Sequence, residues 1–374
     1  MNLKSIKFKS VFSAAVLVFL LANVAWAGPK AQVNLKGKND ADIDRSAIQD
    51  AIDSAPGKSL TIKLSGTFQL DGLDIIVDRS DLVIKGVRGG ATLLGKLGED
   101  GQPIDDFDNF PNRGFLVESV NPLTNIEIKD LALSGFRTPV FIRGQENEIS
   151  DVRVKNHHIE NSFFGVTAIG AASDVLIANN SVIDATNTGV SVFGTSAGRP
   201  TDIHIVDNHI TGAVSNGILI INLSDTVISN NYLATSPSAF DGVPLFVDGT
   251  NSNVLVDSNT TQGGAIGMVL WGDSTGFMLT RNCIRDGGTQ GLSFLRGGGI
   301  QVGGFGFPSS GFDIADNSYA GNLAGDPGIQ RDVWLDFSSS NTSVTERSSV
   351  IVLDEGASNS VAVLPEDGVD HCLD

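Results

Sequence analysis

The chain has 374 residues, 41% of them hydrophobic and 18% charged, and its formal net charge is −18. Such an acidic balance argues against nucleic acid and anionic membrane surfaces as partners, because both repel negative charge. Beyond the N-terminal segment, no stretch approaches the roughly 20 apolar residues of a membrane span. We therefore expect no nucleic acid and no membrane among its partners.

Residues 1–27 have the pattern of a secretory signal peptide. Three lysines precede an apolar run over residues 11–24, and Ala-Trp-Ala at 25–27 gives the small-x-small pattern of a cleavage site. Because this segment carries three lysines and no acidic residue, its removal takes the net charge to about −21. The sequence thus predicts a secreted or periplasmic protein that keeps no membrane anchor after signal removal.

A short amphipathic helix is predicted after the signal peptide. Asp40 and Asp42 are candidate N-caps, and Pro-Gly at 56–57 ends the pattern. The apolar residues at helical spacing are Ile43, Ala47, Ile48, Ala51, Ile52 and Ala55. We expect this helix to close one end of the fold.

Strand patterns begin near Leu60, in SLTIKLSGTFQL and LDIIVDRSDLVIKG. An acidic segment interrupts them at residues 95–114, with Asp100, Asp105, Asp106 and Asp108. Its spacing does not match the D-x-D-x-D-G loop of calcium proteins, so bound Ca²⁺ and a solvated loop both stay open.

Eight short apolar strands in the middle of the chain end at a residue that is nearly always asparagine. These residues are Leu131, His157, Asn180, Asn208, Asn231, Asn259, Asn282 and Asn317. The intervals between them are 26, 23, 28, 23, 28, 23 and 35 residues, which is the period of a solenoid. Inward polar side chains stacked about 4.8 Å apart can hydrogen-bond along the column. We predict a structural asparagine ladder, with His157 as an inward substitute for asparagine.

A second strand follows each of these by about ten residues, as in GVSVFG, GILIIN and GMVLWG. Two sheets per coil are therefore predicted, and a third stays open. The V-x-I-x-x-N pattern also resembles a leucine-rich repeat, which would need a helix in the returning half of each coil. That half is rich in glycine, serine and β-branched residues, which favours strands.

The stacked V-x-I-x-x-N and G-I-x-I units, with AIQDAIDSAPGKSLTIKLSGTFQL before them, resemble the pectin-lyase-like superfamily over about residues 40–340. The resemblance implies an all-β fold: a right-handed, single-stranded parallel β-helix solenoid with a short N-terminal capping helix. We place the N-terminal segment and cap helix at 28–59, the β-helix at 60–340, and C-terminal strands or a closing tail at 341–374.

Proteins that share this fold include lyases, hydrolases and epimerases of acidic polysaccharides, and also adhesins, phage tailspikes and proteins without known activity. The N-T-D, D-D and G-H-G motifs of polygalacturonases, the D-P-H-D motif of alginate C5-epimerases and the R-x-P-x-x-R element of pectate lyases are absent. No catalytic set can therefore be carried over, and a site has to be argued from positions in the coil.

The outward position after the ladder residue supplies candidate catalytic residues. Along successive coils it holds Ala132, His158, Ser181, His209, Tyr232, Thr260, Cys283 and Ser318. A neutral histidine there can remove the C5 proton of a uronate, and a tyrosine or histidine can protonate the leaving oxygen or the opposite face. We predict His158, His209 and Tyr232 as catalytic residues, with His209 and Tyr232 as direct neighbours.

A basic strip on the preceding strands supplies candidate substrate-binding residues, namely Lys129, Arg153, Lys155 and His204. Positive charge there would neutralise a uronate carboxylate and so acidify its C5 proton. The strip can also serve binding alone, or its members can simply pair with acids such as Glu127, Asp130 and Asp151. These three interpretations stay open.

Two further features concern the late coils. Cys283 and Cys372 either form a disulfide that ties the tail to the body or remain two unpaired thiols. The second sheet carries outward aromatic residues that can stack on sugar rings, namely Phe141, Phe193, Phe246, Trp271 and Trp334. We favour instead that residues 337–374 cover this stripe.

Two functional hypotheses follow, both with an acidic polysaccharide or another extended glycan as partner. The first is an exported uronate-directed lyase or C5-epimerase, monomeric and requiring no cofactor, with Ca²⁺ as an option. A hydrolase using two carboxylates such as Asp202 and Asp207 ranks lower, because nothing pairs them in the pattern. The second is a non-catalytic β-helix for glycan binding, surface attachment or envelope structure.

Overall fold

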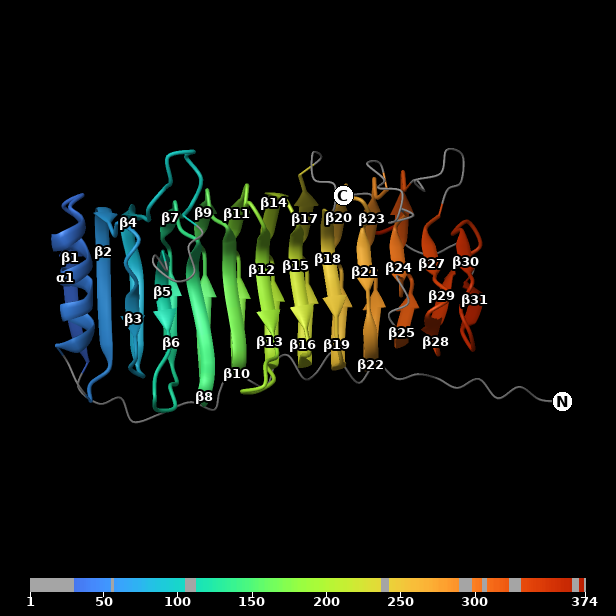
Figure 1. The fold of residues 1–374 in the computed structure, drawn as a ribbon, viewed down its shortest axis with the longest axis horizontal. Helices are drawn as coiled ribbons and strands as arrows, with labels where there is room; N and C mark the ends of the chain where they lie inside the picture. The colour runs from blue at the N-terminus through green and yellow to red at the C-terminus, as the bar shows by residue number, and fades with distance from the viewer. Residues whose placement is uncertain are drawn as a thin grey trace.

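The structure is a computed structural model that describes residues 30–54, 57–104, 112–236, 242–288, 298–304, 308–322, 331–364 and 370–372. The predicted signal peptide lies outside these residues. The strands stack side by side along one axis, with the helix at one end (Figure 1). The all-β class and the parallel β-helix solenoid are confirmed.

Each coil contributes to three parallel sheets, which we name A, B and C. Sheet A holds β1 (Ala31–Lys36), β2 (Leu60–Gln69), β4 (Leu82–Leu94), β6 (Ile126–Lys129), the ends of β8 (Thr138–Lys155) and β10 (Phe164–Ala178), β13 (Thr201–Val206), β16 (Ser224–Ser229), β19 (Asn251–Asp257), β22 (Gly272–Thr280), β25 (Ser309–Ala315), β28 (Ser339–Ser340), β29 (Ser343–Arg347) and β31 (Ser360–Leu364).

Sheet B consists of short strands that follow the ladder residues. After the ends of β2 and β4 it holds β7 (Ala132–Ser134), β9 (His158–Glu160), β11 (Ser181–Ile183), β14 (His209–Ala213), β17 (Tyr232–Thr235), β20 (Thr260–Gln262), β23 (Cys283–Arg285) and β26 (Ser318–Ala320). This is the third sheet that the sequence pattern left open.

Sheet C is the second sheet predicted from the sequence. It holds β3 (Ile75–Val77), β5 (Arg113–Val117), the starts of β8 and β10, β12 (Thr188–Phe193), β15 (Asn216–Ile221), β18 (Val243–Asp248), β21 (Met268–Leu270), β24 (Ile300–Val302), β27 (Val333–Leu335) and β30 (Val352–Asp354). Because strands rather than helices form this returning half, the leucine-rich repeat alternative is wrong.

The predicted cap helix is α1 (Ala41–Asp53), at the end of the stack. The Asp40 carboxylate accepts a hydrogen bond from the Ile43 amide at 3.3 Å, so Asp40 is the N-cap, while Asp42 lies in the first turn. Ile48, with Ala51 and Ile52 beside it, is buried, but Ile43 is 53% exposed and does not belong to the packed face. Strand β1, which the sequence pattern did not predict, lies before the helix and pairs with β2.

The asparagine ladder is confirmed as a buried column. Asn231 is typical: its Oδ1 accepts hydrogen bonds from the backbone amide and the Nδ2 of Asn208, at 2.9 and 3.0 Å. Its own Nδ2 donates to the Asn259 Oδ1 at 2.9 Å. The residue before each ladder position turns the chain with a positive φ, as Asn230 does at 56°, a conformation that asparagine and aspartate tolerate.

Two titratable residues terminate the ladder. His157 substitutes for asparagine as predicted: its amide donates to Asn180 Oδ1, its Nε2–H donates to the Ile128 carbonyl at 3.0 Å, and burial lowers its pKa to about 4. At the other end, the Glu346 carboxylate accepts from the amide and the Nδ2 of Asn317 at 2.9 and 2.8 Å. Burial nevertheless raises the pKa of Glu346 to about 7.

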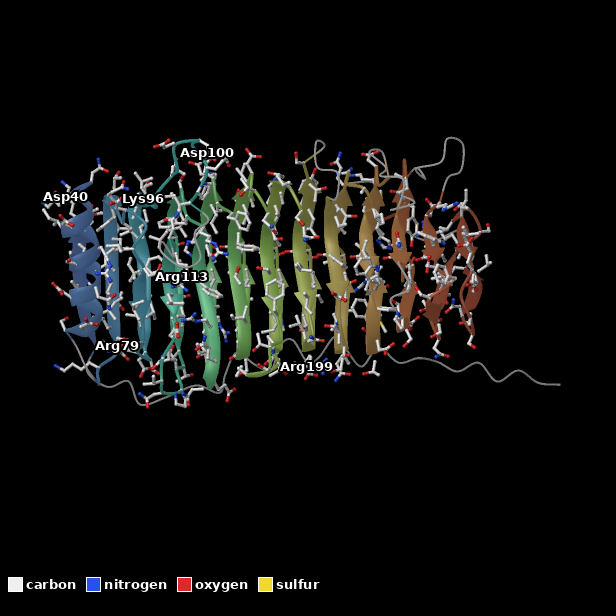
Figure 2. All side chains as sticks on the ribbon, in the orientation of Figure 1. Asp40, Arg79, Lys96, Asp100, Arg113 and Arg199 are labelled. Carbon is white, nitrogen blue, oxygen red and sulfur yellow. A yellow bond between two sulfur atoms is a disulfide. The ribbon has the colours of Figure 1, made fainter. Side chains whose placement is uncertain are left out.

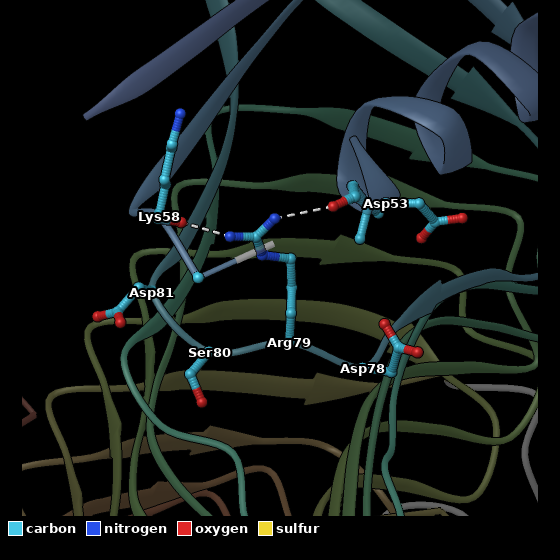
Figure 3. Close-up of a pocket in the computed structure, with 8 residues that line it drawn as sticks. Asp53, Lys58, Asp78, Arg79, Ser80 and Asp81 are labelled. Atoms are coloured by element: carbon cyan, nitrogen blue, oxygen red, sulfur yellow. Dashed lines mark hydrogen bonds between the residues drawn. The ribbon is translucent and has the colours of Figure 1, made fainter. Parts of the chain in front are cut away.

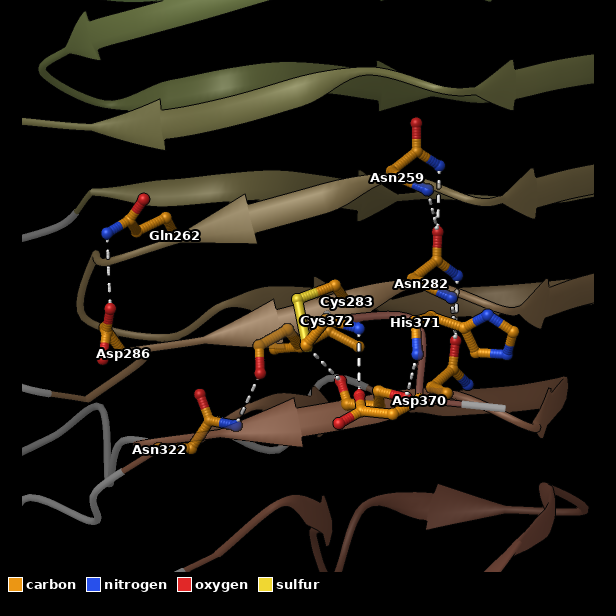
Figure 4. Close-up of a disulfide and its surroundings, with 12 residues drawn as sticks. Asn259, Gln262, Asn282, Cys283, Asp286, Asn322, Asp370, His371 and Cys372 are labelled. Carbon is orange, nitrogen blue, oxygen red and sulfur yellow. Dashed lines mark hydrogen bonds between the residues drawn. A yellow bond between two sulfur atoms is a disulfide. The ribbon is translucent and has the colours of Figure 1, made fainter. Parts of the chain in front are cut away.

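Among the described residues 337–364 and 370–372, the predicted cover over the aromatic stripe of sheet C is not observed, although Glu355 accepts a hydrogen bond from Trp334 Nε1 at 3.0 Å. The rest of the predicted cover, 365–369 and 373–374, lies outside the described residues. Strands β28 to β31 continue the stack, and residues 370–372 return to sheet B (Figure 4). There Cys372 forms a disulfide with Cys283, with the Cα atoms 4.9 Å apart, and the His371 amide donates to Ser318 Oγ at 2.8 Å. Continued strand pairing satisfies the backbone groups of this segment, which a loop lying over another sheet would not do.

Candidate functional site

The predicted catalytic residues lie in one outward column of sheet B. Ser181 pairs with His158 on one side and with His209 on the other, and His209 pairs with Tyr232. The His209 and Tyr232 rings stack with their centroids 4.8 Å apart and their planes 10° from parallel. Sequence spacing therefore placed these two residues correctly.

Two of the three side chains, His158 and Tyr232, have polar partners outside this set. His158 Nε2 lies 3.6 Å from Glu160 Oε2, and the Tyr232 hydroxyl donates to Gln262 Oε1 at 2.5 Å. His158 and His209 are two coils apart, which is about 10 Å at the usual strand spacing. An acid and a base acting on one sugar must lie close together, and among these three residues His209 and Tyr232, in adjacent coils, are the neighbours.

The predicted basic strip lies on sheet A, and its members form ion pairs. Glu127 Oε atoms accept from Lys129 and Lys155, each at 2.6 Å. Burial opposes ionisation of Glu127, but the hydrogen bonds and charges of the two lysines outweigh it, and the pKa of its carboxyl group is lowered. Lys155 thus pairs with Glu127, which agrees with the third interpretation of the strip, pairing with neighbouring acids.

The other two members of the strip are compensated in the same way. Arg153 lies 2.9 Å from Asp151 and 2.9 Å from Asp174, and His204 Nε2 lies 3.0 Å from Asp202 Oδ1. A bound uronate would have to compete with these carboxylates for Arg153 and for His204. Exposed pairs of this kind are individually weak, so the competition is not prohibitive.

A different set of side chains surrounds a cavity of about 450 Å³ on sheet C. Three arginines and three phenylalanines define it, and we name it the arginine groove: Arg113, Arg137, Arg143, Phe141, Phe164 and Phe193. Thr138, Gln145, Thr167 and Ile169 complete the lining, so no carboxylate is among the described residues that line it. The groove is thus cationic and aromatic in a strongly acidic chain.

Neighbouring coils hold the arginines in place. Arg113, from the start of β5 (Figure 2), binds Asp74 through Nη2 at 2.7 Å and through Nε at 2.9 Å. Burial, which outweighs the attraction of Arg113, raises the pKa of Asp74. Arg143 binds Glu118 through Nε at 2.8 Å. Two carboxylates therefore fix two of the three guanidinium groups from outside the groove.

Aromatic rings pack against the same guanidinium groups. The Phe141 ring centroid lies 5.7 Å from the Arg113 guanidinium and 6.0 Å from that of Arg143. Arg137, only 5% exposed, lies 5.8 Å from the Phe164 ring. Cation–π contacts of this kind favour a fixed orientation of each planar group.

Sequence reasoning identified part of this groove. It placed Phe141, Arg143 and Phe193 on the outward face of the second sheet, and the observed register agrees. It missed Arg113 and Arg137. The available signal was their position at the start of a strand of sheet C or immediately before one, in RGFLV and RTPVFI.

Two other cavities have structural explanations. One of about 470 Å³ lies beside the cap helix, where Arg79 donates to the Ile52 carbonyl at 2.9 Å and to the Lys58 carbonyl (Figure 3). Another, of about 370 Å³, lies where residues 370–372 meet β23, next to the disulfide (Figure 4). These contacts fix the cap helix and residues 370–372 to the solenoid.

No metal site is formed by the described residues. Among them, no three His, Cys, Asp or Glu side chains are grouped so as to hold a metal ion. Asp100 of the acidic segment accepts from the Gln102 amide at 3.0 Å. Asp105, Asp106 and Asp108 lie outside the described residues, and the Ca²⁺ prediction stays open with them.

Comparison with known proteins finds a family model and several solved structures. The model described as "Periplasmic copper-binding protein (NosD)" matches residues 120–293. Copper does not fit the described residues of that range, because no three His, Cys, Asp or Glu side chains are grouped there so as to hold a metal ion, and Cys283 is in a disulfide. No curated protein sequence matches the chain.

Three solved structures illustrate the similarity. The mannuronan C-5 epimerase AlgE4 A-module of Azotobacter vinelandii has 13% identity and a TM-score of 0.53, over 91% of this chain and 99% of that one. The endo-xylogalacturonan hydrolase of Aspergillus tubingensis has 12% identity and a TM-score of 0.53, over 91% and 100%. The Agl-KA catalytic domain has 13% identity and a TM-score of 0.54, over 90% and 69%. The chain therefore has the parallel β-helix fold of the pectin-lyase-like proteins.

Proposed function

We propose that this is an exported β-helix protein that binds an acidic polysaccharide, and that the arginine groove is the binding site. The observation that carries the proposal is the lining of the groove: three guanidinium groups and three phenylalanine rings around about 450 Å³. Guanidinium groups bind carboxylates with two parallel hydrogen bonds, and aromatic rings pack on the apolar faces of sugars. A sugar that carries a carboxylate matches both features.

The shape of the molecule and its similarity to solved β-helix structures support this proposal. Sheet C offers a long face of parallel outward columns, which suits an extended polymer better than a compact metabolite. Two of the similar structures are named as enzymes of mannuronan and xylogalacturonan, although a shared fold does not transfer an activity. Export is proposed from the signal-peptide pattern and the periplasmic family description. In the described residues, no helix is long and apolar enough to span a membrane.

A matched pair of variants tests the site. Arg143 of the groove is 26% exposed and Arg153 of the basic strip is 28% exposed, and each is ion-paired with an acidic neighbour. Binding of the mature protein to alginate, polygalacturonate, unsulfated chondroitin and a neutral glucan is measured by calorimetry at two salt concentrations. We expect Arg143→Gln to weaken binding of the preferred acidic polymer at least about tenfold, since a charged hydrogen bond contributes about 1.5–3 kcal/mol.

The control separates the two candidate sites. Arg153→Gln is expected to change the affinity less than twofold, and added salt should weaken the binding of the wild type. If Arg153→Gln weakens binding while Arg143→Gln does not, the basic strip of sheet A is the site. If no acidic polymer binds in preference to the neutral glucan, the proposal is wrong.

A second candidate function is catalysis at sheet B, as a uronate lyase or a C5-epimerase. The stacked and outward-facing His209 and Tyr232 favour it. His209, with His158 as the alternative, would take the C5 proton. The electrons would then form the C4–C5 double bond and expel the C4 oxygen, which Tyr232 would protonate. In the epimerase variant, Tyr232 would instead return a proton to the opposite face of C5.

In this second function the basic strip, Lys129, Arg153, Lys155 and His204, would neutralise the uronate carboxylate. The arginine groove is a weaker candidate for catalysis, because none of the described residues that line it is a histidine, a tyrosine or a carboxylate.

Three signals distinguish the activities on each acidic polymer: ultraviolet absorbance of an unsaturated uronate, new reducing ends and solvent exchange of the C5 proton. A lyase gives the first two, a hydrolase gives reducing ends alone, and an epimerase gives exchange alone. We expect His209→Ala to abolish any activity found while leaving the unfolding midpoint unchanged. Equal activity of His209→Ala and wild type would exclude this base, and measurements with and without a calcium chelator test the Ca²⁺ prediction.

A further inference from the structure

The arginine groove adjoins a second cavity on sheet C that has the opposite charge. This neighbour measures about 400 Å³, and we name it the acidic cavity. Its lining residues are Ile76, Asp78, Leu116, Glu118, Ser119, Val120 and Gln145. Gln145 lines both cavities, so a polymer lying along the sheet can pass directly from one into the other.

The register of sheet C explains how the charge changes from one coil to the next. Ile76 pairs with Leu116, which pairs with Phe141, so these three side chains form one outward column across both cavities. Glu118 and Arg143 follow in the next outward column and bind each other at the boundary between the cavities. The change from carboxylate to guanidinium therefore takes place within one coil, about 4.8 Å.

The acidic cavity is unsuited to a second carboxylate. Asp78 and Glu118 line it, and neither lysine, arginine nor histidine is among its described lining residues. Arg143 compensates Glu118, which leaves the charge of Asp78 to repel an anionic sugar. The apolar side chains of Ile76, Leu116 and Val120 offer contact to a sugar without a charge.

The other flank of the arginine groove also lacks cations. Beyond Phe193, the two outward columns continue through β15, β18 and β21 as Leu219, Ile221, Phe246, Asp248, Val269 and Trp271. None of these carries a positive charge, and the Phe246 and Trp271 rings meet edge to face with centroids 4.8 Å apart. Val269 is buried against Ala265 and Ile266, so the half-buried side chains of this set, such as Ile221 and Phe246, are the ones that favour a sugar without a charge on this side.

We propose that the protein recognises a heteropolysaccharide in which a uronate is flanked by uncharged sugars, such as neutral or N-acetylated hexoses, rather than a homopolymer of uronates. The inference rests on the proposed binding function and adds a substrate class to it. A homopolyuronate places a carboxylate on every unit, so one of them would lie beside Asp78 whenever another lies among the arginines. An alternating polymer places uncharged units on both sides.

The experiment compares polymers of equal length and equal uronate concentration. Unsulfated chondroitin, with alternating glucuronate and N-acetylgalactosamine, is expected to bind at least tenfold more tightly than polygalacturonate or alginate. Asp78→Asn should raise the affinity for the homopolyuronates about three- to tenfold and leave that for chondroitin within twofold. The control is Asp313→Asn, on the exposed face of sheet A, which should change neither affinity.

The outcomes separate this inference from the proposed function. Equal affinity for chondroitin and the homopolyuronates, or no effect of Asp78→Asn on either class, would overturn the inference and leave the binding function intact. Binding of none of the acidic polymers would overturn both. Tighter binding of the homopolyuronates than of chondroitin by the wild type would also overturn the inference, because the acidic cavity would then accept a second carboxylate.

Discussion

Replacing one ladder asparagine in the middle of the stack tests what holds the coils together. Asn231 is 1% exposed and lies between Asn208 and Asn259. Asn231→Ala removes the Oδ1 acceptor and the Nδ2 donors at once, while the backbone can keep its turn at Asn230. The change therefore addresses side-chain hydrogen bonding rather than chain geometry.

The expected loss follows from the groups that are left without partners. The Asn208 backbone amide donates to Asn231 Oδ1 at 2.9 Å and loses this acceptor. The Ile205 carbonyl loses the hydrogen bond that Asn231 Nδ2 donates at 2.8 Å. The Asn208 side chain keeps its bonds to the Ile177 and Val206 carbonyls, so it is not orphaned. One or two unsatisfied buried groups lower the free energy of unfolding by about 1–3 kcal/mol.

Urea unfolding followed by tryptophan fluorescence and by circular dichroism measures the loss. The matched control is Asn34→Ala on the exposed face of β1, which should change the free energy of unfolding by less than about 0.5 kcal/mol. Both variants should keep the wild-type slope with denaturant, because each unfolds the same surface. If the Asn231 and Asn34 variants lose equal stability, the ladder does not stabilise the stack as we reason.

Three further predictions concern the ladder end, the tail and the groove. Since the folded pKa of Glu346 is raised from 4.5 to about 7, its contribution to stability is full below pH 4.5 and is lost as pH rises through 7. Glu346→Gln should therefore remove about 2–3 kcal/mol of the difference in unfolding free energy between pH 5 and pH 8. The pKa of His157 is lowered, so this residue changes stability in the opposite sense, and it does so equally in both proteins. Cys372→Ser opens a disulfide that spans 89 residues and should lower the free energy of unfolding by about 2–4 kcal/mol, and chemical reduction of the wild type should reproduce the loss. Phe193→Ala should weaken glycan binding about three- to tenfold, and Ile221→Ala, one coil further in the same column, less than twofold; equal effects would remove Phe193 from the site.

The sequence was informative about the stack because its determinants repeat. A ladder asparagine contacts its equivalents one coil before and after, so its spacing alone predicts the coil, as Asn208, Asn231 and Asn259 show. The same counting placed His209 beside Tyr232 and Phe193 beside Ile221. In a repeat fold each residue contacts the residue at the same position of the next coil, so the repeat length read from one sequence is enough to predict these contacts.

Several side chains take their orientation from, or form an ion pair with, a partner whose position does not follow from the repeat. Arg113 takes its orientation from Asp74, which lies 39 residues earlier in the chain. Lys129 and Lys155 share a single carboxylate, Glu127, and the sequence left this pairing open beside a role in substrate binding. Side-chain direction and pairing decide both cases, and neither is encoded in the spacing of the strands.

By itself, then, the sequence determined the solenoid, its ladder, the registers of its outward columns and the cap helix, because these depend on local pattern and on stacking of equivalent positions. Only the tertiary structure decided which cations pair with which carboxylates and where a cavity forms. Arg113, Arg137 and Phe164 enter the arginine groove from the starts of strands or the turns before them, and the return of the tail to sheet B leaves sheet C uncovered by residues 370–372. Those outcomes depend on long-range ion pairs and on packing between irregular segments, which the repeat does not constrain.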